Sequence, residues 1–110
     1  MKEQNVQAAC LVALSQAGCL VWRQDTGAYR AKSGALVRYG LCVGSSDIIG
    51  IAPDGLFLAV EIKTDTGRAT EAQHRFIAAV RQAGGRAGIA RCPADAVWIA
   101  TEPLGASEPE

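Results

Sequence analysis

The sequence lacks the cysteine and histidine spacing of a zinc site, and it has no run of apolar residues long enough to cross a membrane. Its four cysteines are scattered without a Cys-x-x-Cys pair, and its one histidine, His74, is far from all of them. This pattern disfavours zinc and favours reduced, mostly buried thiols. The first residues enter an amphipathic pattern without the apolar core of a signal peptide, so we expect a cytoplasmic protein with no membrane partner.

The chain also lacks net charge, because 11 Lys and Arg balance 11 Asp and Glu. The charges are unevenly distributed. Ten bases and six acids lie between Arg23 and Arg91, whereas the residues from Cys92 onward include four acids and no base. Because phosphate binding depends on local potential, a basic body with an acidic tail is able to bind nucleic acid. Dispersed solubilising charge is the simpler interpretation, and charge alone favours it.

Apolar spacing and turn residues predict one α/β domain over residues 1–100, followed by an acidic tail over residues 101–110 that is expected to be disordered. Thr70 and Gln73 match a capping box, and a strand–helix–strand unit in the second half predicts a right-handed connection between parallel strands. The expected elements are a helix over 3–17, strands over 19–23, 28–32 and 35–39, a hairpin within 47–63, a helix over 71–83, a strand over 87–92 and a short helix from Pro93.

The centre of the chain reads as a β-hairpin with polar groups at one end. Asp47 begins the first strand, Asp54-Gly55 forms the turn, and the return strand ends with Glu61 and Lys63. Because alternate side chains of a strand share a face, Glu61 and Lys63 project to the same side. An antiparallel return of this length brings Asp47 beside them. Two carboxylates and an amine are therefore expected to converge at the end of an apolar sheet.

Such a group suits metal-dependent hydrolysis of a phosphodiester. Asp47, Glu61 and the main-chain carbonyl of Ile62 supply the oxygen ligands that magnesium prefers, and a bound metal activates water and polarises the phosphoryl oxygen. Lys63 is then placed to orient the water or to stabilise the transition state. Arg68, in the glycine-containing loop that follows, is the best candidate for a phosphate contact. Glu and Lys two apart on a strand also commonly form a solvated pair, so this spacing alone is a weak signal.

Seven short blocks of sequence place this motif in a wider pattern between about residues 3 and 92. They are Val21–Ala28, Val37–Gly50, Pro53–Gly55, Val60–Lys63, Gly67-Arg68, Gln73 with Phe76, and Gly84–Ala87. In this order they resemble the VRR-NUC branch of the PD-(D/E)xK nuclease superfamily. The resemblance implies a restriction-endonuclease-like α/β fold, with a mixed β-sheet flanked by helices, and an Mg²⁺- or Mn²⁺-dependent nuclease.

By this resemblance, Asp47 and Glu61 are metal ligands and Lys63 is the catalytic lysine. Glu3 matches an acidic residue of the first helix that often completes the acidic site, and Gln73 matches the helix glutamine that follows the core motif. Both have simpler interpretations. Glu3 is also suited to complement the dipole of its helix, and Gln73 is also suited to cap the helix that begins at about Glu71.

One position departs from the family pattern, which has asparagine where this chain has Gln24, and the departure leaves that position without an assigned role. Its neighbour Arg23 is a candidate DNA contact. Arg30, Lys32 and Arg38 are further candidates for a DNA track, although exposed basic residues are common on strands and none of these three is singled out.

Stand-alone members of this size resemble viral or bacterial enzymes that dimerise and cut branched DNA such as four-way junctions. The resemblance thus implies a homodimeric DNA endonuclease in the cytoplasm of a bacterial cell or a phage-infected host. Two alternatives stay open: a module that binds nucleic acid without cutting it, and a metal-free protein-interaction domain. The intact set of Asp47, Glu61 and Lys63 argues against the first. Nothing in the sequence separates DNA from RNA as the substrate.

Overall fold

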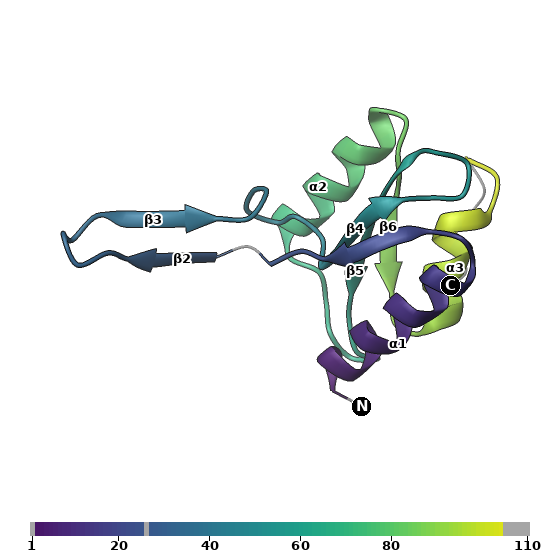
Figure 1. The fold of residues 1–110 in the computed structure, drawn as a ribbon, viewed down its shortest axis with the longest axis horizontal. Coiled ribbons are helices and arrows are strands. Elements are labelled where there is room, and N and C mark those ends of the chain that lie inside the picture. The colour runs from purple at the N-terminus through teal and green to yellow at the C-terminus, as the bar shows by residue number, and fades with distance from the viewer. Residues whose placement is uncertain (1, 26, 105–110) are drawn as a thin grey trace.

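The polypeptide folds as an α/β domain from which a two-stranded ribbon projects (Figure 1). The computed structural model describes residues 2–25 and 27–104. Within these residues a four-stranded mixed sheet is flanked by helices, which confirms the α/β fold expected from the sequence. The elements in chain order are α1 (Glu3–Gln16), β1 (Leu20–Arg23), β2 (Gly27–Arg30), β3 (Leu36–Tyr39), β4 (Ile48–Ile51), β5 (Phe57–Ile62), α2 (Glu71–Gln82), β6 (Arg86–Ala90) and α3 (Pro93–Thr101).

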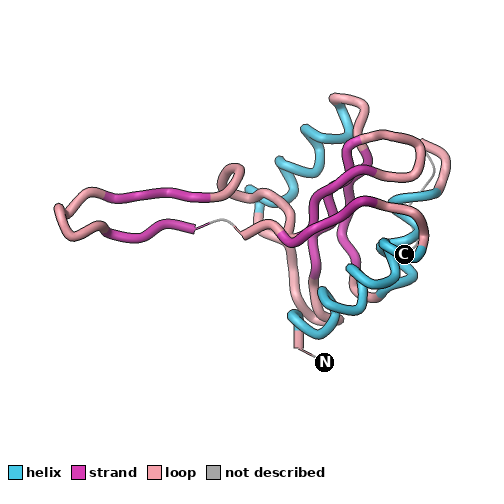
Figure 2. The backbone as a smooth tube through the Cα atoms, in the orientation of Figure 1, coloured by secondary structure: helices cyan, strands magenta, loops and turns pink. Residues whose placement is uncertain are grey.

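The central sheet has the strand order β1-β4-β5-β6. The first three strands pair antiparallel, whereas β6 lies parallel to β5. Helix α2 joins the parallel pair, which is the strand–helix–strand unit that the sequence predicts. Figure 2 shows the sheet between α2 and the two terminal helices.

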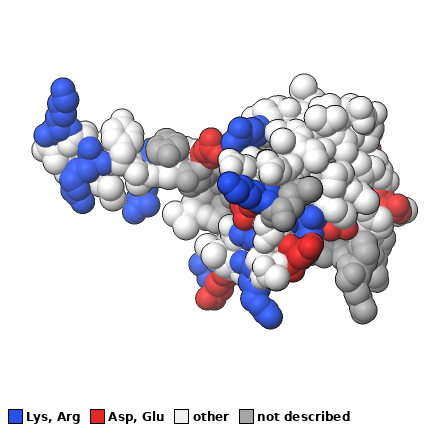
Figure 3. Space-filling view, turned by 90° about the horizontal axis from the view of Figure 1, so that it is seen from below, with Lys and Arg blue, Asp and Glu red and all other residues white. Residues whose placement is uncertain are grey.

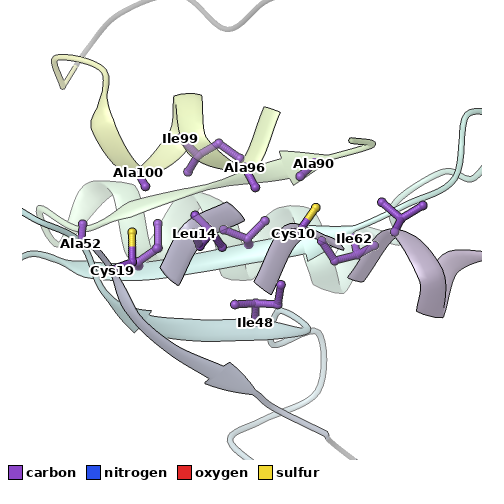
Figure 4. Packing of buried hydrophobic residues seen from close by; sticks show 13 residues of the cluster. Cys10, Leu14, Cys19, Ile48, Ala52, Ile62, Ala90, Ala96, Ile99 and Ala100 are labelled. Atoms are coloured by element: carbon purple, nitrogen blue, oxygen red, sulfur yellow. The ribbon is translucent and has the colours of Figure 1, made fainter. Parts of the chain in front are cut away.

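The two faces of β5 divide the core. Leu58, Val60 and Ile62 belong to a large apolar cluster that includes residues of α1 and α3 (Figure 4). Ala59 belongs instead to a smaller cluster with Ile77 of α2. Since side chains alternate along a strand, Glu61 shares the face of Ala59. The strand therefore directs Glu61 toward the α2 side of the sheet and away from α1.

Helix α1 follows the sequence signals closely. It ends at Gln16, one residue earlier than predicted, and Gly18 then takes a φ of 95°, a conformation that side-chain-bearing residues rarely adopt. Cys10 and Leu14 of the predicted apolar stripe are fully buried against the sheet. The stripe thus fixes which side of α1 faces the core.

All four cysteines are free thiols, but only two are buried. Cys10 and Cys19 lie in the large apolar cluster, where burial raises the pKa of Cys10 to about 11. Cys42 and Cys92 are exposed, because Cys42 lies in the loop after β3 and Cys92 immediately precedes α3. The prediction of mostly buried thiols is wrong for these two.

The ribbon of β2 and β3 forms an arm (residues 27–39) that leaves the body of the domain (Figures 1 and 2). Its strands pair antiparallel with one another, Arg30 opposite Leu36, and neither joins the central sheet. The domain with its arm measures 48 Å along its longest axis, against 32 and 25 Å across. The sequence predicts both strands to within two residues at each end. It does not predict that they stand apart from the sheet.

The last described residues are attached to the domain. Helix α3 continues to Thr101, and the main-chain carbonyl of Glu102 accepts a hydrogen bond from Arg86 Nη1. The segment predicted as an acidic tail over residues 101–110 therefore begins with the last residue of α3 and with Glu102, which is bonded to Arg86, and residues 105–110 lie outside the described part. No helix within residues 2–25 and 27–104 is long and apolar enough to span a bilayer.

Candidate metal and nucleic-acid site

Two carboxylates from neighbouring strands meet at one end of the sheet. Asp47 immediately precedes β4, and Glu61 is the penultimate residue of β5. The antiparallel register pairs Ile48 with Val60, so Asp47 lies level with the end of β5. Its Oδ2 accepts a hydrogen bond of 2.9 Å from the main-chain N–H of Ile62. The hairpin thus returns as its spacing predicts, and both carboxylates lie on the α2 side of the sheet.

The carboxylate of Glu61 is buried, and its two oxygens differ in their surroundings. Oε2 accepts a hydrogen bond of 3.1 Å from Gln73 Nε2 and lies 3.4 Å from Lys63 Nζ. Oε1 is buried and receives no hydrogen bond from a donor group of the described residues. Burial, followed by the nearby Asp47 carboxylate, raises the pKa of Glu61 to about 8, although Lys63 opposes the shift. The Asp47–Glu61 pair can therefore accept one more positively charged partner.

The donor set fits a hard divalent cation. Asp47, Glu61 and the main chain of Ile62 offer oxygen ligands, and the partnerless Glu61 Oε1 is the kind of acceptor that a cation satisfies. No group of three or more His, Cys, Asp or Glu side chains placed to hold a metal occurs in the described part of the chain. Magnesium keeps several waters and commonly binds through one or two carboxylates, so two acids suffice for it.

Glu3 is not brought into this group. It is exposed in the first turn of α1, and α1 packs on the face of the sheet opposite to α2. An acid at this position complements the positive end of the helix dipole, so its placement favours the simpler of the two interpretations. A role for Glu3 at the metal stays a prediction.

Gln73 caps its helix and contacts Glu61 with the same side chain. Its Oε1 accepts a hydrogen bond of 2.8 Å from the N–H of Thr70, while Thr70 Oγ1 accepts one of 3.1 Å from the N–H of Gln73. This reciprocal pair is the capping box that the sequence predicts. The amide Nε2 then remains to donate to Glu61. Because the cap fixes the orientation of the amide, it also fixes the donor that Glu61 receives.

The loop after β5 is fastened by a residue that sequence reasoning did not single out. Arg91, which follows β6, donates through Nη1 to the carbonyls of Thr64 and Gly67, the latter at 2.7 Å. The N–H of Lys63 donates to the Ala90 carbonyl, so β6 also holds the start of this loop. Arg68 is exposed in the same loop. In the sequence, the signal for this contact is the position of Arg91, a basic residue directly after the strand that pairs with β5.

Gln24, to which the sequence assigned no role, holds the base of the arm. Its N–H donates to the Asp47 carbonyl (2.7 Å), its Nε2 to Ser45 Oγ (2.9 Å), and its Oε1 accepts from the N–H of Leu41 (3.1 Å). Through its side chain and its main chain, Gln24 thus connects the end of β1 to the segment that leads from the arm to Asp47. Arg23, by contrast, pairs with Ile48 and by strand alternation shares the α1 face, away from the carboxylate pair.

A cavity of about 650 Å³ opens beside the carboxylate pair. It lies between the arm, the segment over residues 43–47 and the start of α2, and its lining includes Asp47, Gln73 and Arg38. Gly44 allows the segment over residues 43–47 to pack directly against the start of α2. With a φ of 87°, it packs so closely that a Cβ there would lie 2.4 Å from the main-chain oxygen of Ala72.

Comparison with protein-family models matches residues 1–94 to the VRR-NUC domain. The matched range includes the whole central sheet, the arm and the residues of the carboxylate site, and only α3 extends past it. Comparisons with curated proteins and with solved structures give no match. Since the family model covers most of the 110 residues, the chain belongs to the VRR-NUC family of nuclease-type, nucleic-acid-processing domains.

Proposed function

We propose that this protein is a divalent-metal-dependent endonuclease that hydrolyses DNA phosphodiesters. The observation that carries the proposal is the carboxylate pair, in which a buried Glu61 oxygen receives no hydrogen bond from a donor group of the described residues. Two carboxylates this close are stable only when a proton or a cation reduces their repulsion. VRR-NUC nucleases are generally dependent on divalent metals, which favours the cation.

Each residue near the pair has a part in the proposed reaction. Asp47, Glu61 and the main-chain carbonyl of Ile62 hold Mg²⁺ or Mn²⁺. When bound, the metal lowers the pKa of a coordinated water and polarises a phosphoryl oxygen. Gln73 keeps the Glu61 carboxylate in one orientation through its hydrogen bond. Lys63 lies close enough to the pair to orient the attacking water or to stabilise charge on the phosphate.

The proposed substrate is branched DNA, such as a four-way junction, cut by a homodimer. One chain carries one carboxylate pair, whereas resolution of a junction needs two cuts, so two copies related by symmetry supply both. Helix α2 packs on β5 and β6 and reaches Ile49 of β4, whereas among the described residues no helix packs on the same face of β1. Contiguous exposed apolar side chains commonly mark a protein interface. Those on and beside this part of the sheet are Leu20, Trp22, Ile51 and Phe57.

The metal site is tested by calorimetric titration of Mn²⁺ into the wild type, Asp47→Asn and Glu61→Gln. An asparagine at position 47 keeps an oxygen for the Ile62 N–H but removes the charge, so the fold is expected to survive while Mn²⁺ binding is lost. Glu71→Gln, a change of equal size at an exposed acid of α2, serves as the control and is expected to bind normally. Undiminished binding by Asp47→Asn and Glu61→Gln would overturn the site.

The activity is tested by incubating the wild type and Lys63→Ala with junction, flap and linear duplex DNA, with and without Mn²⁺. We expect metal-dependent cleavage, fastest on the junction, and a rate lowered about 10²–10³-fold in Lys63→Ala because a charge that stabilises the transition state is removed. DNA that is bound but never cut would assign a binding module instead. Equal cleavage by Lys63→Ala would point to another site.

The homodimer is tested by sedimentation equilibrium. We expect the wild type to sediment as a dimer and Trp22→Glu to sediment as a monomer, because a charge in the centre of an apolar interface is costly to bury. Val12→Glu, at an exposed apolar residue of α1 on the other side of the sheet, is the control. A monomeric wild type would remove the dimer from the proposal without touching the metal site.

A further inference from the structure

Positive charge gathers on the arm, where the described residues offer it no acidic partner. Arg30, Lys32 and Arg38 lie within or between its strands, and no Asp or Glu occurs from Gly27 to Ser46. Figure 3 shows Lys and Arg side chains along the arm, with acidic side chains beginning only where it meets the body. No salt bridge of the described residues involves these three bases. Their charge is thus left for a partner of opposite sign.

The two arginines share one face of the ribbon. Ala28 pairs with Arg38 and Arg30 with Leu36, so alternation places both arginine side chains on the same face, at diagonal positions whose backbones are about 7–8 Å apart. The opposite face carries the Tyr29–Val37 pair. Arg30 Nη1 donates to the Gly34 carbonyl (2.7 Å), which holds its side chain along the ribbon toward the turn. An anion laid along this face is attracted by both arginines.

The basic face is continuous with the carboxylate site. Arg38, at the root of the arm, lines the same cavity as Asp47 and Gln73. Arg30 lies farther out on the same face, and Lys32 lies close to the tip. A polyanion that starts in the cavity and runs outward along this face meets one base after another.

We propose that the arm is a substrate-holding element whose Arg30–Arg38 face contacts the phosphates of duplex DNA on one side of the cleavage point. The proposal rests on the nuclease function proposed above and extends it to residues outside the carboxylate site. An isolated two-stranded ribbon is marginally stable in water, so DNA bound along it also stabilises its strands. The other candidate for the arm, a second copy of this chain, is less suited to it because the arm carries three bases and no acid.

The test measures binding of a fluorescein-labelled blunt DNA duplex by anisotropy, in EDTA and over a series of salt concentrations. We expect Arg30→Ala to weaken binding at every salt concentration and to lower the slope of log K against log salt by about 1, because one phosphate contact is lost. Arg75→Ala removes an equal charge from the outer side of α2, where Arg75 pairs with Glu71, and is expected to leave the slope unchanged. Equal losses in both variants would overturn the proposal.

A variant that moves one positive charge to the opposite face of the ribbon distinguishes the effect of charge position from the effect of net charge. Tyr29→Arg/Arg30→Ala keeps the charge of the chain but places it on the opposite side of the ribbon. Tyr29 is 56% exposed, so the side chain there tolerates the exchange. We expect this double variant to bind as weakly as Arg30→Ala. Recovery of wild-type affinity would show that only the total charge matters and would overturn the assignment of the face.

Replacement of residues 29–37 by Asn-Gly removes the outer arm and leaves the Ala28–Arg38 pair. We expect this variant to lose DNA affinity and to keep the oligomeric state of the wild type in sedimentation. Unchanged DNA affinity together with a changed oligomeric state would assign the arm to protein contacts. If the nuclease function fails but the arm proposal holds, the arm variants still bind DNA more weakly than the wild type, and neither the wild type nor any variant cuts DNA with any metal. If the arm proposal fails alone, truncation changes neither binding nor cleavage, and Lys63→Ala still slows cleavage.

Discussion

The end of the sheet that carries Asp47 and Glu61 differs from the arm in how its charged groups are held. Glu61 is 1% exposed and fixed by Gln73 and Lys63, and Asp47 is fixed by the main chain of β5. On the arm, Arg30 and Arg38 are exposed on a ribbon that pairs only with itself. The comparison teaches that reacting groups need fixed geometry and a dry environment, whereas groups that gather a long polyanion need reach and exposure.

The largest expected difference is in stability. Leu58→Ala removes a fully buried side chain of β5 and is expected to lower the free energy of unfolding by about 2–5 kcal/mol. Leu36→Ala makes the same change on the arm, where the side chain is 52% exposed, and is expected to cost less than about 0.5 kcal/mol. Urea unfolding followed by tryptophan fluorescence measures both. Comparable losses would mean that the arm packs on the body of the domain in solution.

The pH dependence of stability is expected to come from the site and not from the arm. The pKa of Glu61 is raised from 4.5 to about 8, so the folded state binds a proton more tightly than the unfolded state. The stabilisation is therefore complete below about pH 4.5 and is lost as pH rises through 8, by an amount on the order of a few kcal/mol for the metal-free protein.

Chemical denaturation in EDTA at a series of pH values checks this expectation. Glu61→Gln cannot titrate, so its unfolding free energy is expected to be flatter between pH 5 and 8. Saturating Mn²⁺ is expected to restore stability at pH 8, because it binds only the folded site. A metal-free protein that becomes more stable over this range would contradict the raised pKa.

A matched pair of glycine substitutions tests the segment that connects the arm to Asp47. Gly44→Ala introduces a Cβ 2.4 Å from the Ala72 main chain at a φ of 87°, and is expected to cost about 1–3 kcal/mol and to lower cleavage by displacing Asp47. Gly34→Ala, in the arm turn, has a similar φ of 90° but no atom within 4 Å of the added Cβ. It therefore reports the backbone strain alone. Equal losses of stability and activity would show that the contact with α2 does not matter.

The smallest effect is expected at Gln24. Gln24→Ala removes the side chain that accepts from the Leu41 N–H and donates to Ser45, a loss of about 1 kcal/mol confined to the base of the arm. Hydrogen exchange is expected to accelerate several-fold at the Leu41 amide and to stay unchanged at the amides of β5. Gln16→Ala, at the exposed end of α1, is the control. Faster exchange throughout the sheet would mean that Gln24 supports the whole fold.

Much of the fold follows from short-range signals. The alternation of β5, the Asp54-Gly55 turn and the capping box at Thr70 each act between residues that are close in sequence, and each has the predicted structure. The meeting of Asp47 with the end of β5 is also of this kind, because a hairpin of known length returns to a known place. The two strands of the arm were predictable for the same reason.

Other features depend on packing between elements that are far apart in the sequence. Only the tertiary structure decides that Glu61 is buried, that the capping amide of Gln73 reaches it, and that Arg91 fastens the loop after β5. It also decides that Glu3 lies apart from the carboxylate pair and that the arm stands clear of the sheet.

By itself, the sequence determined which segments form helices and strands and which acids share an end of a hairpin, because periodicity and turn chemistry are local. The layering of α1, α2 and α3 on the two faces of the sheet determined the surroundings of those acids. Burial and the distances between elements set the electrostatic energy of a charged group, and both arise only when the separate elements pack together.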